Sequence, residues 1–359
     1  MRAAAIDPTE PVSRRETSRW GFFRRIIGSS GMIPALILLI IAGTLLSDNF
    51  LSVVNLSNVL RLSAVIGLLA IGQTLVIVSG GGGIDLSVGS VAAASAVVGA
   101  LFQGFGPVGV VAIALAAGAF FGLVNGLGVT TGGMQPFIVT LATFTIARGV
   151  AYQLTNAQPI YLDATGLQKL ATGTLGEVPI PIFALLLAVV VTQLILSRTT
   201  YGRNLYAVGG NEEAAYTSGV NVRRYRIGVY VASGLFAGLA GVFGMAQLNT
   251  ADPNFGNGYE LTAIAAVVVG GALLSGGKGS VVGTAIGVLI MAFLSNLLNL
   301  LNVNPWTTLM ITGVIIVVVV GLNREQSRGR ENRLWNGAPF YIALGAGAVV
   351  LYLISSHPA

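Results

Sequence analysis

The chain has 359 residues, of which 54% are hydrophobic and only 9% are charged, and its net charge is +6. Soluble globular domains carry about 25% charged residues, so these few charges cannot cover a water-facing surface. The composition excludes a soluble enzyme, a nucleic-acid-binding protein and a disordered chain, and it predicts an all-α, polytopic transmembrane helical bundle surrounded by membrane lipid. Because the chain has no Cys and a single His, we expect no metal site and no cofactor.

Apolar runs of membrane-spanning length recur along the chain. A hydrocarbon core of about 30 Å requires roughly 20 apolar residues per helix. Ten predicted spans lie at 31–47, 60–79, 84–103, 107–130, 136–154, 179–197, 227–248, 260–275, 280–301 and 305–322. An eleventh run at 338–355, flanked by Trp335 and Tyr352, predicts one further C-terminal span.

The cationic residues predict the domain layout and its orientation. Sixteen of the 19 Lys and Arg residues fall in four segments that alternating spans place on one side of the membrane. By the positive-inside rule this side, including the N-terminus, is cytoplasmic, and Arg61, Arg148 and Lys169 fall near the outer face. The predicted domains are the N-terminal segment 1–30, the transmembrane domain 31–322 with its cytoplasmic loop 198–226, the basic linker 323–337 and the extra helix 338–355.

A run of four glycines, Gly80–Gly83, precedes Ile84 and Asp85 between the second and third predicted spans. We expect the glycines to form a tight inner turn and Asp85 to cap the next helix, with Ser87 in its first turn. A carboxylate at the membrane centre costs about 2.5–3.5 kcal/mol on insertion scales, so Asp85 should lie near the inner surface or a water-filled path. A structural cap and a gating or coupling role both stay open.

Other polar residues inside the predicted spans are candidates for a translocation path. Uncharged groups that donate and accept hydrogen bonds suit a neutral, polyhydroxylated solute. With Asp85 included, the candidates are Gln73, Thr74, Asp85, Ser87, Asn125, Thr140, Thr143, Asn296 and Asn299. The alternative is that these groups hydrogen-bond between neighbouring helices. The spans contain no central carboxylate cluster or His relay, which argues against a proton-driven pump.

The loop 198–226 contains a short helix with its own start and stop signals. Gly209-Gly210 is expected to break the preceding structure, Asn211 is a good N-cap, and Gly219 is a natural stop. Glu212 and Glu213 suit the first turn of the helix between these limits. A helix of about seven residues is unstable alone. It is therefore either a docking helix for a cytoplasmic protein or a solvated connector.

Four runs resemble the ribose/pentose branch of the ATP-binding-cassette (ABC) importer permeases. Glu213-Ala214-Ala215 followed by Gly219 matches the signature E-A-A-x-x-x-G of such permeases. The other runs are Gly83–Ser90, Gly258–Val268 and Gly276–Gly279, and the resemblance extends from about residue 50 to residue 322. The chain departs from the family at its C-terminus, where ten spans are usual and an eleventh is predicted here.

The resemblance implies partners on both faces of a bacterial inner membrane. ABC ATPase subunits would contact the loop through Gly202, Asn211, Glu212, Glu213, Ala214, Ala215 and Gly219, and a second permease copy, identical or homologous, would lie alongside. A periplasmic or lipid-anchored sugar-binding protein would dock on the outer face near the loop 155–178, which has a weakly helical stretch at 165–171. Candidate docking residues are Asp163, Lys169, Asp252 and Glu260, with plain solvated loops as the alternative.

The glycine-rich turn at Lys278 does not form a nucleotide-binding loop. The P-loop pattern G-x-x-x-x-G-K-[ST] fails because Ala272 stands at its first position and Gly279 at its last. We therefore expect no enzyme activity in this chain and ATP hydrolysis in a separate subunit. The expected function is the permease of an importer for ribose, another pentose or a related monosaccharide. The alternatives are a permease for branched-chain amino acids or an autoinducer-type sugar, and a secondary transporter without an ATPase.

Overall fold

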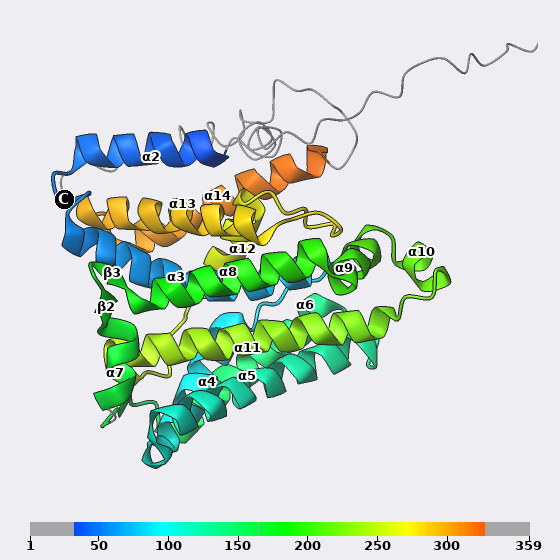
Figure 1. Cartoon of the computed structure of the whole chain (residues 1–359), viewed down its shortest axis with the longest axis horizontal. Coiled ribbons are helices and arrows are strands. Elements are labelled where there is room, and N and C mark those ends of the chain that lie inside the picture. Colours follow the sequence, from blue (N-terminus) through cyan, green and yellow to red (C-terminus); the bar gives the residue numbers. More distant parts are fainter. Residues whose placement is uncertain (1–31, 164, 327–359) are drawn as a thin grey trace, which may run out of the picture.

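The computed structural model describes residues 32–163 and 165–326 as a bundle of helices that run along one long axis (Figure 1). The predicted segment 1–30, the extra helix 338–355 and residues 327–337 of the predicted linker lie outside the described residues.

Within the described residues, six helical stretches are long and apolar enough to cross a membrane, judged by length and composition. They are α3 (Val53–Val78), α5 (Gly106–Thr130) with the preceding turn η1 (Gln103–Phe105), α6 (Pro136–Thr155), α8 (Ile180–Arg198), α11 (Val222–Leu248) and α13 (Val281–Leu300). Shorter apolar helices are α2 (Met32–Leu46), α4 (Val88–Leu101), α12 (Tyr259–Val269) and α14 (Pro305–Gln326, apolar over Pro305–Val317). The helical membrane bundle is confirmed. Each of the ten spans predicted between residues 31 and 322 overlaps one of these helices, whereas the number of crossings stays a prediction.

Short elements cover the two ends of the bundle (Figure 1). What we call the α7 end carries α7 (Thr165–Thr172), the antiparallel pair β1 (Ile160–Tyr161) and β4 (Thr250–Ala251), and the hairpin of β2 (Thr174–Leu175) and β3 (Val178–Pro179). Helix α7 confirms the helical stretch predicted at 165–171. The opposite end, the α10 end, carries α9 (Thr200–Gly210) and α10 (Glu212–Thr217).

Two predicted spans, 84–103 and 260–275, are helical over only part of their length, and we call the short helices in them interrupted. Helix α4 begins only at Val88, and helix α12 already ends at Val269. At 1.5 Å per residue, the 14 residues of α4 reach about 21 Å and the 11 residues of α12 about 17 Å, both short of a hydrocarbon core. Hydropathy conceals these breaks because the flanking glycines and apolar side chains continue each apolar run.

Helices α4 and α12 begin inside the bundle with their N-termini close together. The segment before α4 enters from the α10 end, where Gly80 packs against Gly209, and the segment before α12 enters from β4 at the α7 end. The two meet at Gly89 and Gly256, where a Cβ on Gly89 would lie 2.3 Å from the carbonyl oxygen of Gly256. Irregular backbone at membrane depth is tolerated only where the protein itself surrounds it.

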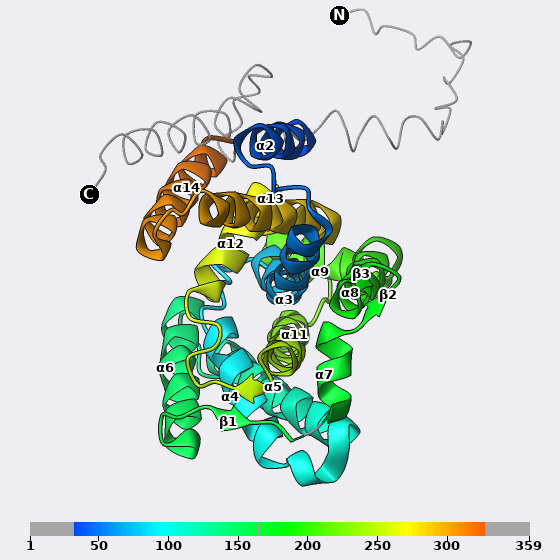
Figure 2. The ribbon, with the colours of Figure 1, turned by 90° about the vertical axis from the view of Figure 1, so that its left-hand side faces the viewer.

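Helices α3 and α11 lie at the centre of the cross-section, with the other helices around them (Figure 2). Of the residues in the most apolar 18-residue stretch of α3, 89% are buried within the chain. Helix α11 packs against α5 through glycines: a Cβ on Gly234 would lie 2.1 Å from the carbonyl oxygen of Gly118. Small residues at such crossings allow the close helix packing on which membrane bundles depend.

Candidate coupling site and buried polar network

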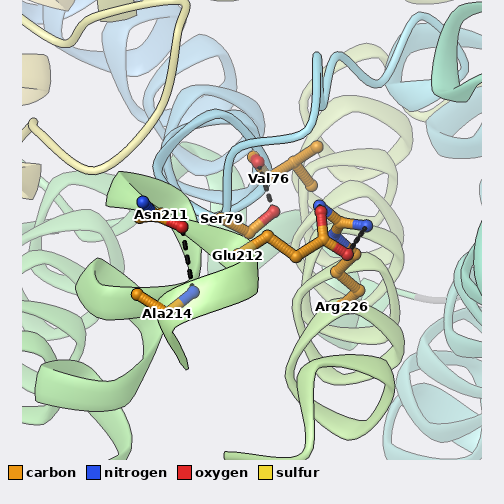
Figure 3. Close-up of polar contacts among 6 residues, drawn as sticks. All are labelled: Val76, Ser79, Asn211, Glu212, Ala214 and Arg226. Carbon is orange, nitrogen blue, oxygen red and sulfur yellow. Dashed lines mark hydrogen bonds and ion pairs between the residues drawn. The ribbon is translucent and has the colours of Figure 1, made fainter. Parts of the chain in front are cut away.

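Helix α10 is a short, capped helix on the surface of the α10 end. Its N-cap is Asn211, whose side-chain Oδ1 accepts a hydrogen bond from the backbone N–H of Ala214 at 2.9 Å (Figure 3). Gly219, after the helix, has a φ of +84°, which suits a stop. Ala215 is buried, whereas Glu212, Glu213, Ala214 and the side chain of Tyr216 are exposed. The predicted cap, helix and stop are therefore present, and its outer face is uncovered.

The glycine pair before α10 differs from its prediction. Gly209 and Gly210 do not break the preceding structure but form the last turn of α9, and the break falls at Asn211, which is extended. A Cβ on Gly209 would lie only 1.9 Å from the carbonyl oxygen of Val78, at the end of α3. Gly209 therefore serves close packing between α9 and α3.

Three glycine-rich turns, far apart in sequence, meet at this point and are called here the glycine junction: 80–83, 209–210 and 276–279. Gly277 donates its backbone N–H to the carbonyl oxygen of Val78 at 3.0 Å. A Cβ on Gly276 would lie 2.4 Å from the Cα of Gly80 and 2.9 Å from the carbonyl oxygen of Gly209. Tyr206 of α9 adds a hydrogen bond from its hydroxyl to the carbonyl oxygen of Gly279 at 2.7 Å. No side chain fits at the closest of these contacts, so α9 and the turn before α4 are in direct backbone contact.

Arg226, in the first turns of α11, connects α10 to the same turn. Its guanidinium donates to both carboxylate oxygens of Glu212, at 3.0 and 2.6 Å (Figure 3). The same side chain lies over Gly81, where a Cβ would be 2.2 Å from its Nη2. The arginine side chain is 16% exposed and that of Glu212 is 51% exposed, so one partner is fixed and the other faces solvent. Bidentate pairs of this kind fix geometry as well as charge.

Helix α9 is held to α11 by aromatic side chains. Tyr201 stacks on Tyr225 with ring centroids 5.0 Å apart, and Asn204 donates to the Tyr225 hydroxyl at 2.8 Å. Burial, reinforced by the neighbouring Tyr225, raises the pKa of Tyr201. Gly202 is buried against α8, where a Cβ would lie 2.1 Å from the carbonyl oxygen of Leu196. Helix α9, which leads into α10, is therefore tightly packed against α8 and α11.

An open groove of about 730 Å³ lies between α10 and the ends of α5 and α11. Its lining includes Thr130, Glu212, Tyr216, Val220, Asn221 and Arg223. A concave surface with both apolar and charged groups beside an exposed short helix is suited to receive part of another protein.

Asp85 lies at the centre of a buried polar network. The side chain is 2% exposed, and its oxygens accept hydrogen bonds from the Ser87 hydroxyl at 2.6 Å and the Ser233 hydroxyl at 2.8 Å. It also accepts from the backbone N–H of Ser87 at 3.0 Å, and Ser87, not Asp85, is the N-cap residue of α4. The expected helix cap is thus replaced by a turn that stabilises the break before α4.

Three more of the predicted path residues hold the same break in place. The amide of Gln73 pairs with the backbone N–H and C=O of Asp85 at 3.2 and 3.0 Å. Asn125 donates to the Ser87 hydroxyl at 2.9 Å, and Thr140 donates to the carbonyl oxygen of Ile84 at 3.2 Å. These side chains satisfy irregular backbone that would otherwise be unpaired at membrane depth.

The remaining predicted path residues divide into interior and surface positions. Thr74 and Thr284 share a hydrogen bond of 2.7 Å between α3 and α13, and Thr143 is buried. Asn296 forms a double amide pair with Asn55 at 2.9 and 2.7 Å. Thr74 and Asn296 therefore make the expected bonds between helices, and a role in the translocation path stays a prediction for all of these residues. Asn299, in contrast, is exposed in a groove.

The four predicted docking residues differ in their exposure. Asp163 and Lys169 are exposed at the α7 end, and Asp252 is half-buried, where it accepts from the backbone N–H of Asn254 at 2.8 Å. Glu260 is only 9% exposed, because the chain turns inward before α12. The prediction of a surface docking role for Glu260 is therefore wrong.

Arg148, predicted near the outer face, is buried within the chain, with 8% of its surface exposed. From α6 it donates to the carbonyl oxygens of Pro253 and Phe255, the latter at 2.9 Å, and so holds the irregular segment before α12. An arginine inside an apolar run was the available signal, since buried membrane charges have defined partners. Within the described residues, no cluster of His, Cys, Asp or Glu side chains suits a metal ion.

A helical bundle with interrupted helices and a capped surface helix has the features of the membrane-spanning subunit of a transporter. The chain belongs to the family described as branched-chain amino acid transport system, permease component, whose model matches residues 55–320. It is thus a multi-pass membrane permease and not an enzyme.

Relatives within this family have more specific descriptions. The chain is 42% identical to the ribose import permease protein of Bacillus subtilis (strain 168), over 85% of this chain and 95% of that protein. It is 34% identical to the D-allose transport system permease protein of Escherichia coli (strain K12), over 81% and 90% of the two chains. It is 37% identical to a probable ABC transporter permease protein of the same strain, over 84% and 91%. No solved structure matches the chain at a significant level.

Proposed function

We propose that the chain is the membrane-spanning permease subunit of an ABC importer for a monosaccharide, with ribose as the first substrate to test. The observation that carries this proposal is the exposed, capped α10 with Glu213 on its outer face, joined to the membrane helices at the glycine junction. Relatives described as ribose and D-allose permeases support a sugar as substrate. The ATPase would be a separate subunit that receives α10 beside the groove at the α10 end.

The orientation follows from this role. The α10 end faces the cytoplasm, the N-terminus lies on the same side, and the ten apolar helices cross or enter the inner membrane. The α7 end faces outward, where Asp163 and Lys169 are exposed to a periplasmic or lipid-anchored sugar-binding protein. The positive-inside distribution of Lys and Arg supports this orientation.

A second permease copy would cover the face formed by α6, α12 and α14, which lie on one side of the cross-section (Figure 2). This face exposes Phe137 and Leu309 beside polar groups such as Asn299. The exposed apolar side chains on this face favour contact with another protein. The polar groups beside them favour a path for the substrate between the two copies. The buried residues around Asp85 then act as a scaffold for the path.

ATP-driven closure of the ATPases would move α10, and two contacts would pass the movement on. The ion pair of Glu212 with Arg226 and the glycine junction both end at the turn 80–83, which leads to Asp85 and the start of α4. Displacement of this turn would tilt α4 against α12 and change access to the path from one face to the other.

The test is uptake of radiolabelled sugar by cells that express the chain with the ATPase and binding protein encoded beside it. We expect uptake of ribose that depends on ATP, and loss of both uptake and ATPase co-purification in Glu213→Lys. The control Glu177→Lys reverses an exposed charge at the α7 end and should keep ATPase co-purification. Leucine uptake without sugar uptake, or full ribose uptake by Glu213→Lys, would contradict the proposal.

A further inference from the structure

A second groove, of about 340 Å³, lies where the N-terminal parts of α12 and α14 meet the end of α13. Among the described residues, its lining contains hydroxyl, amide and aromatic side chains and no charged residue. The polar and aromatic members are Asn257, Tyr259, Thr262, Ser295, Asn299, Trp306, Thr308 and Thr312. Ligand sites in proteins commonly hold about 300–1,000 Å³, so this space suits a small molecule.

Several polar side chains in this groove have no partner. Asn257, Ser295 and Asn299 make no side-chain hydrogen bond within the described part of the chain, although Asn257 and Asn299 are exposed and Ser295 is half-buried. This contrasts with Asn296, one helical position from Ser295, whose amide is fully paired with Asn55. Amides and hydroxyls without a partner in the chain are free to bind a polar occupant.

The chemistry of the lining narrows the class of occupant. Amide and hydroxyl groups both donate and accept, which matches the hydroxyls of a polyol. Trp306 is 74% exposed at the rim and offers an apolar face for the carbon face of a sugar ring. An amino acid would bring an ammonium and a carboxylate, and none of the described lining residues carries a charge to pair with either. The lining therefore favours a neutral sugar over a zwitterion.

We propose that this groove is a weak monosaccharide-binding site on the translocation path, with Asn299 and Trp306 as its main contacts; the inference rests on the proposed function. The site lies where α12 begins inside the bundle, so the sugar contacts the interrupted helix whose neighbour α4 is linked to α10. Uncharged contacts keep binding weak and allow release toward the cytoplasm.

The direct test is saturation-transfer NMR on the full-length permease in lipid nanodiscs, with millimolar D-ribose and no binding protein present. We expect transfer to ribose and none to leucine. The signal should fall about two- to tenfold in Asn299→Leu, as loss of one hydrogen bond implies, and similarly in Trp306→Leu. Trp306→Phe should retain most of it. The control Asn49→Leu changes an exposed amide outside the groove and should leave the signal unchanged.

The same variants are then assayed for uptake in the complete importer. Because the binding protein captures the sugar, we expect Asn299→Leu to lower the maximal uptake rate and leave the apparent KM unchanged. If both Leu variants show the same transfer to ribose as the wild type, the groove is not the sugar-binding site. If these variants also no longer form dimers, the occupant of the groove is a helix of the partner copy. Absence of any sugar uptake by the wild-type importer instead contradicts the proposed function itself.

Discussion

Arg226 and Arg148 both hold an irregular segment that leads into an interrupted helix, but only one of them has a carboxylate partner. Arg226, at the α10 end, pairs with both oxygens of Glu212 and covers Gly81 before α4. Arg148 binds the carbonyl oxygens of Pro253 and Phe255 before α12, and its Nε and Nη2 have no partner. Glu260 nearby keeps an oxygen without a partner as well.

The two arginines therefore differ in what they connect: Arg226 joins two helices through an ion pair, whereas Arg148 binds backbone carbonyl oxygens only. A half-exposed pair such as Arg226 with Glu212 contributes little stability, commonly below about 1 kcal/mol, but it fixes two helices relative to each other. Arg148 instead holds backbone carbonyl groups of one irregular segment and, among the described residues, forms no ion pair that fixes it to a second helix. We therefore expect movement to be transmitted rigidly at the α10 end and accommodated around α12.

The largest loss of stability is expected for a substitution at Gly209, where the packing leaves no room for a side chain. In Gly209→Ala the new Cβ would meet the carbonyl oxygen of Val78 at 1.9 Å, so α9 must separate from α3. Gly210→Ala is the matched control, because nothing lies within 4 Å of its Cβ and alanine is the better helix former. Thermal unfolding of the purified permease should show a strong loss of stability in the first variant only. Equal melting temperatures would contradict the glycine junction.

A smaller effect is expected at Arg148. Arg148→Met keeps the aliphatic stem but leaves the carbonyl oxygens of Pro253 and Phe255 unpaired, which should lower the free energy of unfolding by about 2 kcal/mol. The measurement is denaturant unfolding in detergent, with Arg224→Gln as a control because Arg224 is exposed. An unchanged free energy would show that the arginine does not hold the segment before α12.

The smallest effect is expected at Glu260. One carboxylate oxygen is buried without a hydrogen-bond partner, but the carboxylate also interacts favourably with the charge of Arg148, so Glu260→Gln removes opposing contributions and should change the free energy of unfolding by less than about 1 kcal/mol. The same unfolding assay decides the sign. A loss comparable to that of Arg148→Met would show that Glu260 has a partner after all, and the comparison of the two arginines would fail.

Periodic and compositional signals in the sequence predict the parts of the fold that depend on local chemistry. Apolar runs locate the helices, and Asn211 with Gly219 locates α10, because capping depends on neighbouring residues alone. The breaks before α4 and after α12 were missed, since Gly, Ile and Leu keep the hydropathy high there. The roles of Gln73, Asn125 and Thr140 depend on which distant backbone they meet, and a single sequence does not contain this information.

The positive-inside count does not predict the burial of Arg148. Counting assigns each cation to a surface, whereas Arg148 is buried by carbonyl groups more than a hundred residues later in the chain. The same long-range dependence applies to the glycine junction. Its three turns are conspicuous in sequence, but their contact follows from the packing of α3, α9 and α13.

The central claim is that α10 is coupled to the interrupted helix α4 through Arg226. The most direct test measures sugar uptake and ATP hydrolysis together in proteoliposomes that contain the complete importer with Arg226→Gln, beside Arg224→Gln as a control. We predict that Arg226→Gln retains ATP hydrolysis while uptake per ATP falls about tenfold, and that Arg224→Gln behaves as the wild type. Unchanged uptake per ATP in Arg226→Gln would contradict the account.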